Sequence, residues 1–95
     1  MPEPRHRRFL HITFEYSVEP AELKEQLDKA LDWIRYTPHC WLVWTSSSTN
    51  RWYTRLRKLV EKGDRLFICE VNITERKGWM PRSFWNFIRE HEEED

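Results

Sequence analysis

The stretch HCWLVWTSSSTNRWYTRLRKLVEKGDRLFICEV, residues 39–71, changes its pattern three times and decides the fold. It contains two apolar runs, Trp41–Trp44 and Leu66–Cys69, whose bulky residues favour buried strands. Between them a polar string leads into apolar residues at helical spacing, with Ser48 or Thr49 suited to cap the helix and Gly63 to end it. The stretch therefore predicts a strand, a helix and a second strand.

The residues before this stretch complete the predicted sheet. Along Phe9–Tyr16 the side chains alternate with a period of two, which is typical of a strand buried on one face. A helix is expected from Pro20 to Leu31, because proline suits a first helical turn and apolar residues then recur on one face. Trp33–Thr37 is rich in strand formers and is expected to form a hairpin with Cys40–Thr45. With right-handed crossovers, the order predicts an α+β ferredoxin-like βαββαβ sandwich: a four-stranded antiparallel sheet with two helices on one face.

A short aromatic segment lies near the end of the chain, with four aromatic residues in nine between Trp79 and Phe87. Ser83 is suited to cap a short helix that places Phe84, Phe87 and Ile88 on one side, against the same sheet or against a second copy. The sequence of 95 residues is too short for two cores. We therefore expect a single domain over residues 1–95, with mobile ends at about 1–7 and 91–95.

The composition limits the classes of function. Sixteen basic and sixteen acidic residues balance, so the chain lacks the strong positive charge of the simplest nucleic-acid binders. Cys40 and Cys69 lie in apolar runs without the spacing of metal ligands, and we expect reduced, buried thiols. We find neither the apolar core of a signal peptide nor a membrane span, which predicts a cytoplasmic protein without a membrane partner. No cofactor is expected unless the protein is a nuclease.

Two segments carry a resemblance to a known family. The hairpin DWIRYTPHCWLVWT, residues 32–45, and the strand DRLFICEV, residues 64–71, with a tryptophan-containing tail, resemble the SinR-like family, which is related to the CRISPR-associated protein 2 family. The resemblance covers about Phe9 to Ile88. It implies a ferredoxin-like fold, a homodimer formed through sheet edges and C-terminal segments, and association with DNA or RNA, for which the CRISPR-associated relatives act as a scaffold.

Basic residues of the second predicted helix give the clearest binding pattern. Four cations recur at intervals of four, three and four residues, which places them on one face opposite Trp52 and Leu56: Arg51, Arg55, Lys58 and Lys62. With Arg5, Arg7 and Arg8 before the first strand, this stripe is suited to lie along a phosphate backbone without reading bases. The alternative is an ordinary solvated helix face.

Two other functions remain open. The resemblance implies a metal-dependent nuclease in which an aspartate at the end of the first strand binds magnesium or manganese; Glu15 stands at that position and would act at a dimer axis. His11 on the same strand face is a weaker candidate for a general base.

An aromatic tail on a neutral protein also fits a partner-binding or toxin–antitoxin component. Exposed tryptophans would stack on single-stranded bases, although we expect most of them in the core.

Overall fold

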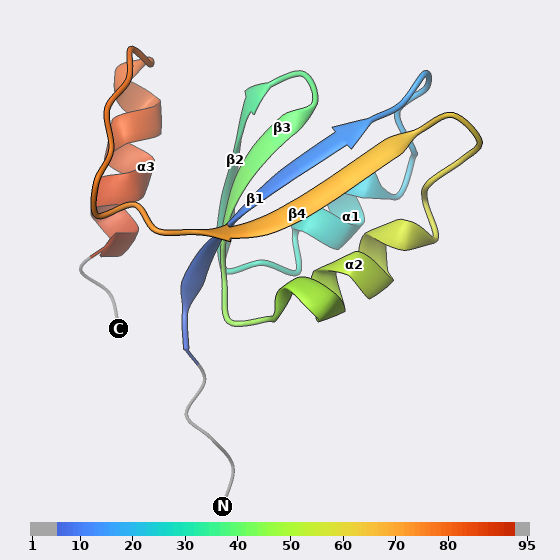
Figure 1. Ribbon diagram of the computed structural model, residues 1–95, viewed down its shortest axis with the longest axis horizontal. Coiled ribbons are helices and arrows are strands. Elements are labelled where there is room, and N and C mark those ends of the chain that lie inside the picture. Colours follow the sequence, from blue (N-terminus) through green and yellow to red (C-terminus); the bar gives the residue numbers. More distant parts are fainter. Residues whose placement is uncertain (1–5, 93–95) are drawn as a thin grey trace, which may run out of the picture.

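A computed structural model, which describes residues 6–92, shows one antiparallel sheet and three helices (Figure 1). In chain order the elements are β1 (Arg8–Glu15), α1 (Leu23–Leu27), β2 (Asp32–Thr37), β3 (Cys40–Thr45), α2 (Thr49–Arg57), β4 (Arg65–Val71) and α3 (Arg82–Glu92). The strands lie in the order β2-β3-β1-β4, and each neighbouring pair is antiparallel. The predicted α+β class and the four-stranded antiparallel sheet are therefore confirmed.

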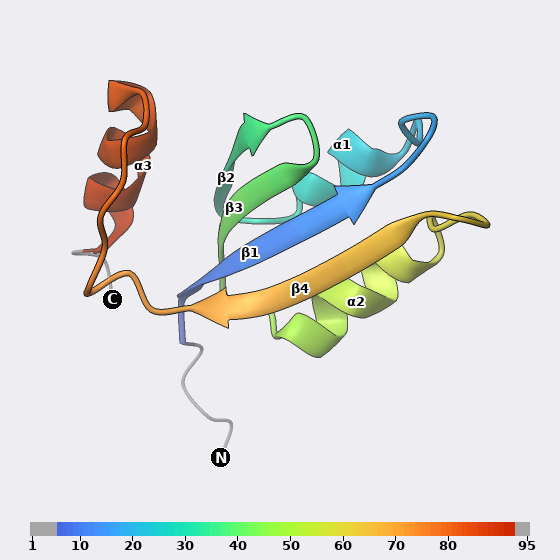
Figure 2. The same cartoon turned by 45° about the horizontal axis from the view of Figure 1, so that its top comes forward.

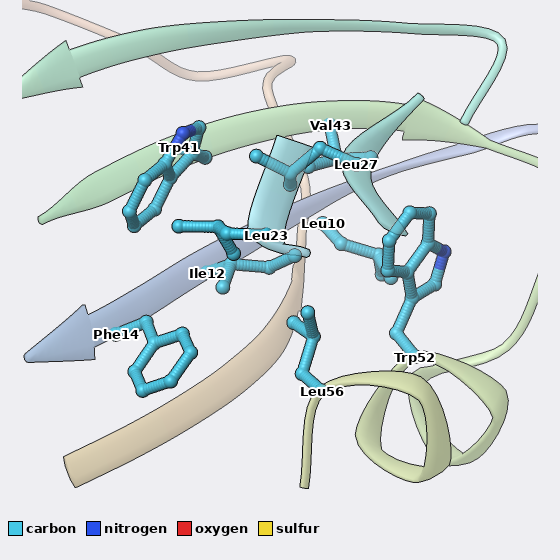
Figure 3. Close-up of a cluster of buried hydrophobic side chains, with 9 residues drawn as sticks. All are labelled: Leu10, Ile12, Phe14, Leu23, Leu27, Trp41, Val43, Trp52 and Leu56. Carbon is cyan, nitrogen blue, oxygen red and sulfur yellow. The ribbon is translucent and has the colours of Figure 1, made fainter. Parts of the chain in front are cut away.

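One face of the sheet, called here the first face, is covered by α1 and α2. The buried cluster combines alternate residues of β1 and β3 with apolar residues of the two helices (Figure 3): Leu10, Ile12, Phe14, Leu23, Leu27, Trp41, Val43, Trp52 and Leu56. Trp52 is fully buried, and its indole N–H donates a hydrogen bond of 3.1 Å to Oγ1 of Thr45. This bond ties α2 to the end of β3.

The opposite face, called here the second face, is covered in part by α3, which stands on the other side of the sheet from α1 and α2 (Figures 1 and 2). A second buried cluster forms there: Phe9, Leu42, Trp44, Phe87 and Ile88. The ring centroid of Phe9 lies 4.7 Å from that of Trp44 and 6.1 Å from that of Phe87. The aromatic residues of α3 thus pack on the sheet of their own chain. Strand β3 is covered on both faces, which explains its continuous apolar run.

The first helix is shorter than predicted. It spans Leu23–Leu27, and on either side the chain forms turns, in which Leu23 N–H donates to Pro20 O and Ala30 N–H donates to Leu27 O. Leu31, expected on the inner helical face, is 53% exposed, and its N–H donates to Trp44 O. The chain leaves the helix early because Leu31 already joins the sheet.

The second helix also ends earlier than predicted. Ser48 caps it, since its Oγ accepts the N–H of Arg51 at 3.1 Å, and the helix ends at Arg57. Beyond Arg57 the backbone hydrogen bonds join residues three apart in sequence, such as the 2.9 Å bond that Leu59 N–H donates to Leu56 O. Gly63, with φ of 89°, then turns the chain into β4, a conformation that favours glycine.

The ends and the cysteines differ in part from expectation. His91 and Glu92, predicted in a mobile end, form the last turn of α3, whereas residues 1–5 and 93–95 lie outside the described chain. Both thiols are free, but Cys40 at the start of β3 is only half-buried, and Cys69 on the edge strand β4 is exposed. Among the described helices, none has the length and apolar character needed to cross a bilayer.

Candidate nucleic-acid interface

Helix α2 carries its cations without any acidic residue in its sequence, Thr49–Arg57. Arg51 in the first turn is exposed, and Arg55 one turn later is half-buried. Within residues 6–92, neither guanidinium group forms an ion pair. The two arginines therefore present positive charge that no carboxylate of the described chain neutralises.

Arg55 differs from a freely solvated surface arginine. Its guanidinium carbon lies over the Trp52 ring, 4.7 Å from the centroid, as expected for a cation–π contact between residues three apart on a helix. Its Nη1 atom is buried and has no hydrogen-bond partner. Burial, and then the charge of Arg51, lower the pKa of Arg55. The expectation that Arg55 lies opposite Trp52 is therefore wrong, because the two side chains stack.

The predicted stripe of four cations does not continue along one helix face. Lys58 follows the last helical residue, and Lys62 lies in the turn before β4. Both line a cleft of about 720 Å³ together with acidic side chains, among them Glu22 and Asp64. The structure thus separates Arg51 and Arg55, which stand without acidic neighbours on the helix, from two lysines in a mixed-charge cleft.

The arginines near the N-terminus occupy a different position. Arg5 lies outside the described residues, and Arg7 is exposed. Arg8 is half-buried, and its Nη1 lies 3.6 Å from Oε1 of Glu70 on β4. In the sheet, Arg8 pairs with Thr45, the residue that also binds Trp52. The start of β1 and the helix that carries Arg51 are therefore tied to the same end of the sheet.

A small polar hollow lies at the start of α2. Ser46, Ser47, Ser48 and Arg51 line it, and its volume is about 230 Å³. The serine string that precedes the helix thus places hydroxyl groups beside the first exposed arginine. Hydroxyl and guanidinium donors of this kind suit the oxygen atoms of a phosphate group.

The predicted metal ligand stands apart from other ligands. Glu15 is exposed at the end of β1, where Arg65 of β4 is its neighbour across the sheet. In the part of the chain that the structure describes, one group of three side chains has the spacing of metal ligands, and it consists of Asp32, Glu90 and His91. Glu15 is not in this group.

His11 has partners that the sequence did not indicate. Its Nδ1 lies 2.8 Å from the Tyr36 hydroxyl, and its Nε2 lies 2.8 Å from Oγ1 of Thr13. Burial lowers the pKa of His11, and burial, with a further contribution from Cys40, raises the pKa of Tyr36 to about 12. Both shifts favour the neutral forms. Tyr36 lies 25 residues from His11 in sequence. The one signal in the sequence was the alternation of side chains along the strand that contains Tyr36, which indicates a face but not a partner.

Comparison with protein-family models, with curated proteins and with solved structures finds no match in any of the three. The resemblance to the SinR-like family therefore remains a prediction based on the two quoted segments.

Proposed function

We propose that this protein is a small nucleic-acid-associated protein that works as a homodimer and binds the phosphate backbone through α2. The proposal includes a ferredoxin-like arrangement and kinship with the SinR-like and CRISPR-associated families. The order β2-β3-β1-β4, with α1 and α2 in the two crossovers on one face, supports that arrangement. Two free thiols are consistent with a cytoplasmic location.

The observation that carries the proposal is the uncompensated guanidinium pair of Arg51 and Arg55. A partly buried cation without a partner lowers stability, because burial removes water that would solvate its charge. The buried Nη1 of Arg55 and the lowered pKa of that side chain both indicate such a situation. A bound anion would pair with the exposed guanidinium group of Arg51 and reduce the repulsion between the two arginines. Phosphate suits this role, since its oxygens accept paired hydrogen bonds from a guanidinium group.

We expect binding that depends little on base sequence. The cations lie on a helix that packs against its own sheet through Trp52 and Leu56, and the adjoining hollow is formed by short serine side chains. Contacts of this kind fix the position of a backbone, whereas sequence is read from base edges.

The homodimer is supported by the edges of the sheet. Within residues 6–92, β4 pairs with β1 alone, so one side of its backbone has no partner strand there, and the strand contains neither proline nor glycine. Phe67 on this strand is 62% exposed. Edge strands of this kind are ready to pair with another chain, and a second copy would cover both the backbone and the phenyl ring.

The experiment is a binding comparison with a matched loss of charge. The variant Arg51→Gln/Arg55→Gln should bind labelled duplexes of two unrelated sequences more weakly than the wild type, to the same extent for both. The control Lys29→Gln/Arg89→Gln removes two exposed cations, one from the turn after α1 and one from α3, and should retain wild-type affinity. Equal affinity of the α2 variant and the wild type would contradict the proposal.

A further inference from the structure

A groove opens between the second face of the sheet and the segment that leads into α3. Its volume is about 430 Å³, and its lining is mostly apolar. One side of the groove is formed by the sheet, including His11 of β1 and Tyr36 of β2. The other side is formed by side chains from residues 71–88. Figure 2 shows this segment rising beside α3, on the side of the sheet away from α1 and α2. The size and lining are typical of a ligand site.

Aromatic rings form a continuous wall of this groove. Tyr36 contacts Phe84 edge-on with ring centroids 5.4 Å apart, and Phe84 contacts Trp85 in the same manner at 5.4 Å. A side chain at Gly78 would place its Cβ 3.6 Å from the Trp85 ring, so the backbone lies directly against that indole. These contacts hold the wall in a defined shape before any ligand binds.

The next residue in the chain, Trp79, is 99% exposed although it lines the same groove. A fully exposed indole is unusual, because burying such a side chain is strongly favourable. Lys77, two residues earlier, is also exposed and forms no ion pair with any residue between 6 and 92. An unpacked indole beside a free cation is the combination that proteins use to bind single-stranded nucleic acid.

The polar groups of the groove are suited to a base edge. His11 and Tyr36 are hydrogen-bonded to each other and remain neutral near pH 7, since burial lowers the pKa of one and raises that of the other. Tyr36 and Thr13 already occupy both ring nitrogens of His11, so the Tyr36 hydroxyl, which can donate or accept, is the group left to hydrogen-bond a heterocycle. Neither neutral side chain would attract a charged group.

We infer that this groove binds an unpaired base of a single-stranded nucleic acid, with Trp79 as the stacking platform at its rim. A base in a duplex is stacked and paired, so only a splayed base can enter a groove of this size. This inference rests on the proposed function in one respect, which is that the ligand is a nucleic acid. It does not require the arginine pair, which lies on the other side of the sheet.

Fluorescence anisotropy with an oligothymidylate of about 12 nucleotides and a duplex of the same length tests this site. Trp79→Ala should weaken single-strand binding roughly 5- to 150-fold, the range that loss of one stacked base gives, and leave duplex binding unchanged. Trp79→Phe should retain most of the affinity, because a phenyl ring still stacks. Neither change should disturb folding, since the Trp79 side chain is almost wholly exposed.

Photo-crosslinking with 5-iodouracil in the same oligonucleotide locates the base. We expect crosslinked peptides from residues 77–85, and crosslinks confined to α2 would overturn the inference. Unchanged single-strand affinity of Trp79→Ala, or an equal loss for duplex, would also overturn it.

The two proposals fail in different ways. If Arg51→Gln/Arg55→Gln binds both nucleic acids as the wild type does, while Trp79→Ala loses the single strand, the base site stands and the backbone site on α2 fails. If Trp79→Ala has no effect while the arginine variant loses both ligands, only the base site fails. A wild type that binds neither ligand near 50 mM salt, where non-specific association is strong, would overturn both.

Discussion

Thr45 is the point at which the helix carrying the two arginines is joined to the sheet, and Thr45→Val removes that join without changing the shape of the core. The residue is 1% exposed, and its Oγ1 accepts two hydrogen bonds. One comes from the indole N–H of Trp52 at 3.1 Å, and the other from the backbone N–H of Ser47 at 3.0 Å. Valine fills nearly the same volume, so the expected loss comes from unmade hydrogen bonds and not from a cavity.

The structure sets the size of this loss. Trp52 is fully buried, so its N–H would remain without a partner, which costs about 1–3 kcal/mol. Ser47 is only half-buried, so water can reach its N–H, and we assign that bond about 1 kcal/mol at most. We therefore expect Thr45→Val to lower the free energy of unfolding by about 1–4 kcal/mol. Urea denaturation followed by circular dichroism measures it, with an unchanged m-value as the sign that unfolding exposes the same surface.

A double-mutant cycle isolates the hydrogen bond. Trp52→Phe deletes the donor, so in that background Thr45→Val should cost about 1 kcal/mol or less, the part that belongs to Ser47. If the valine substitution costs the same in both backgrounds, or less than about 0.5 kcal/mol in the wild type, the buried bond does not hold α2 in place.

Two further predictions concern pH and assembly. Because the pKa of His11 is below its ordinary value of 6.5 in the folded chain, the unfolded chain takes up a proton first as the pH falls, so stability should decrease from about pH 6.5 downward until the folded pKa is reached. His11→Gln should show a smaller decrease between pH 7 and 5 in urea denaturation, and an identical pH profile would contradict the burial of this ring. Sedimentation at micromolar concentration should show a homodimer; a single species of 11.9 kDa would refute the dimer, whose interface should persist at that concentration.

The sequence predicted those features that depend on residues close together in the chain. Strand β3 was predicted with its observed bounds, Cys40–Thr45. Its continuous apolar run has a proline turn before it and a serine string after it, and these fix where the strand begins and ends. Alternation along β1 predicted one buried face, and Leu10, Ile12 and Phe14 share the face that α1 and α2 cover. The lengths of the first two helices were overestimated, since apolar spacing continues past Arg57 in residues such as Leu59 that pack against the core from turns, whereas α3, predicted to be short, spans Arg82–Glu92.

The candidate sites depend on distant contacts that spacing does not reveal. His91 lies 2.8 Å from Asp32 although 59 residues separate them, and the His11–Tyr36 pair spans 25 residues. The stacking of Arg55 on Trp52 follows from their spacing of three, and a charge-based description of the helix overlooked it. The exposure of Trp79 was likewise hidden, because its neighbours in the aromatic tail are largely packed.

The salt dependence of duplex binding tests most directly the claim that α2 contacts phosphates. Each neutralised phosphate releases condensed counterions, which contributes about 0.9 to the slope of log affinity against log salt. Between about 50 and 200 mM salt, we expect the wild type to lose affinity steeply and Arg51→Gln/Arg55→Gln to show a slope shallower by roughly one to two units. The control Lys29→Gln/Arg89→Gln should keep the wild-type slope. Equal slopes for the wild type and the α2 variant, or no binding by the wild type at about 50 mM salt, would contradict the account.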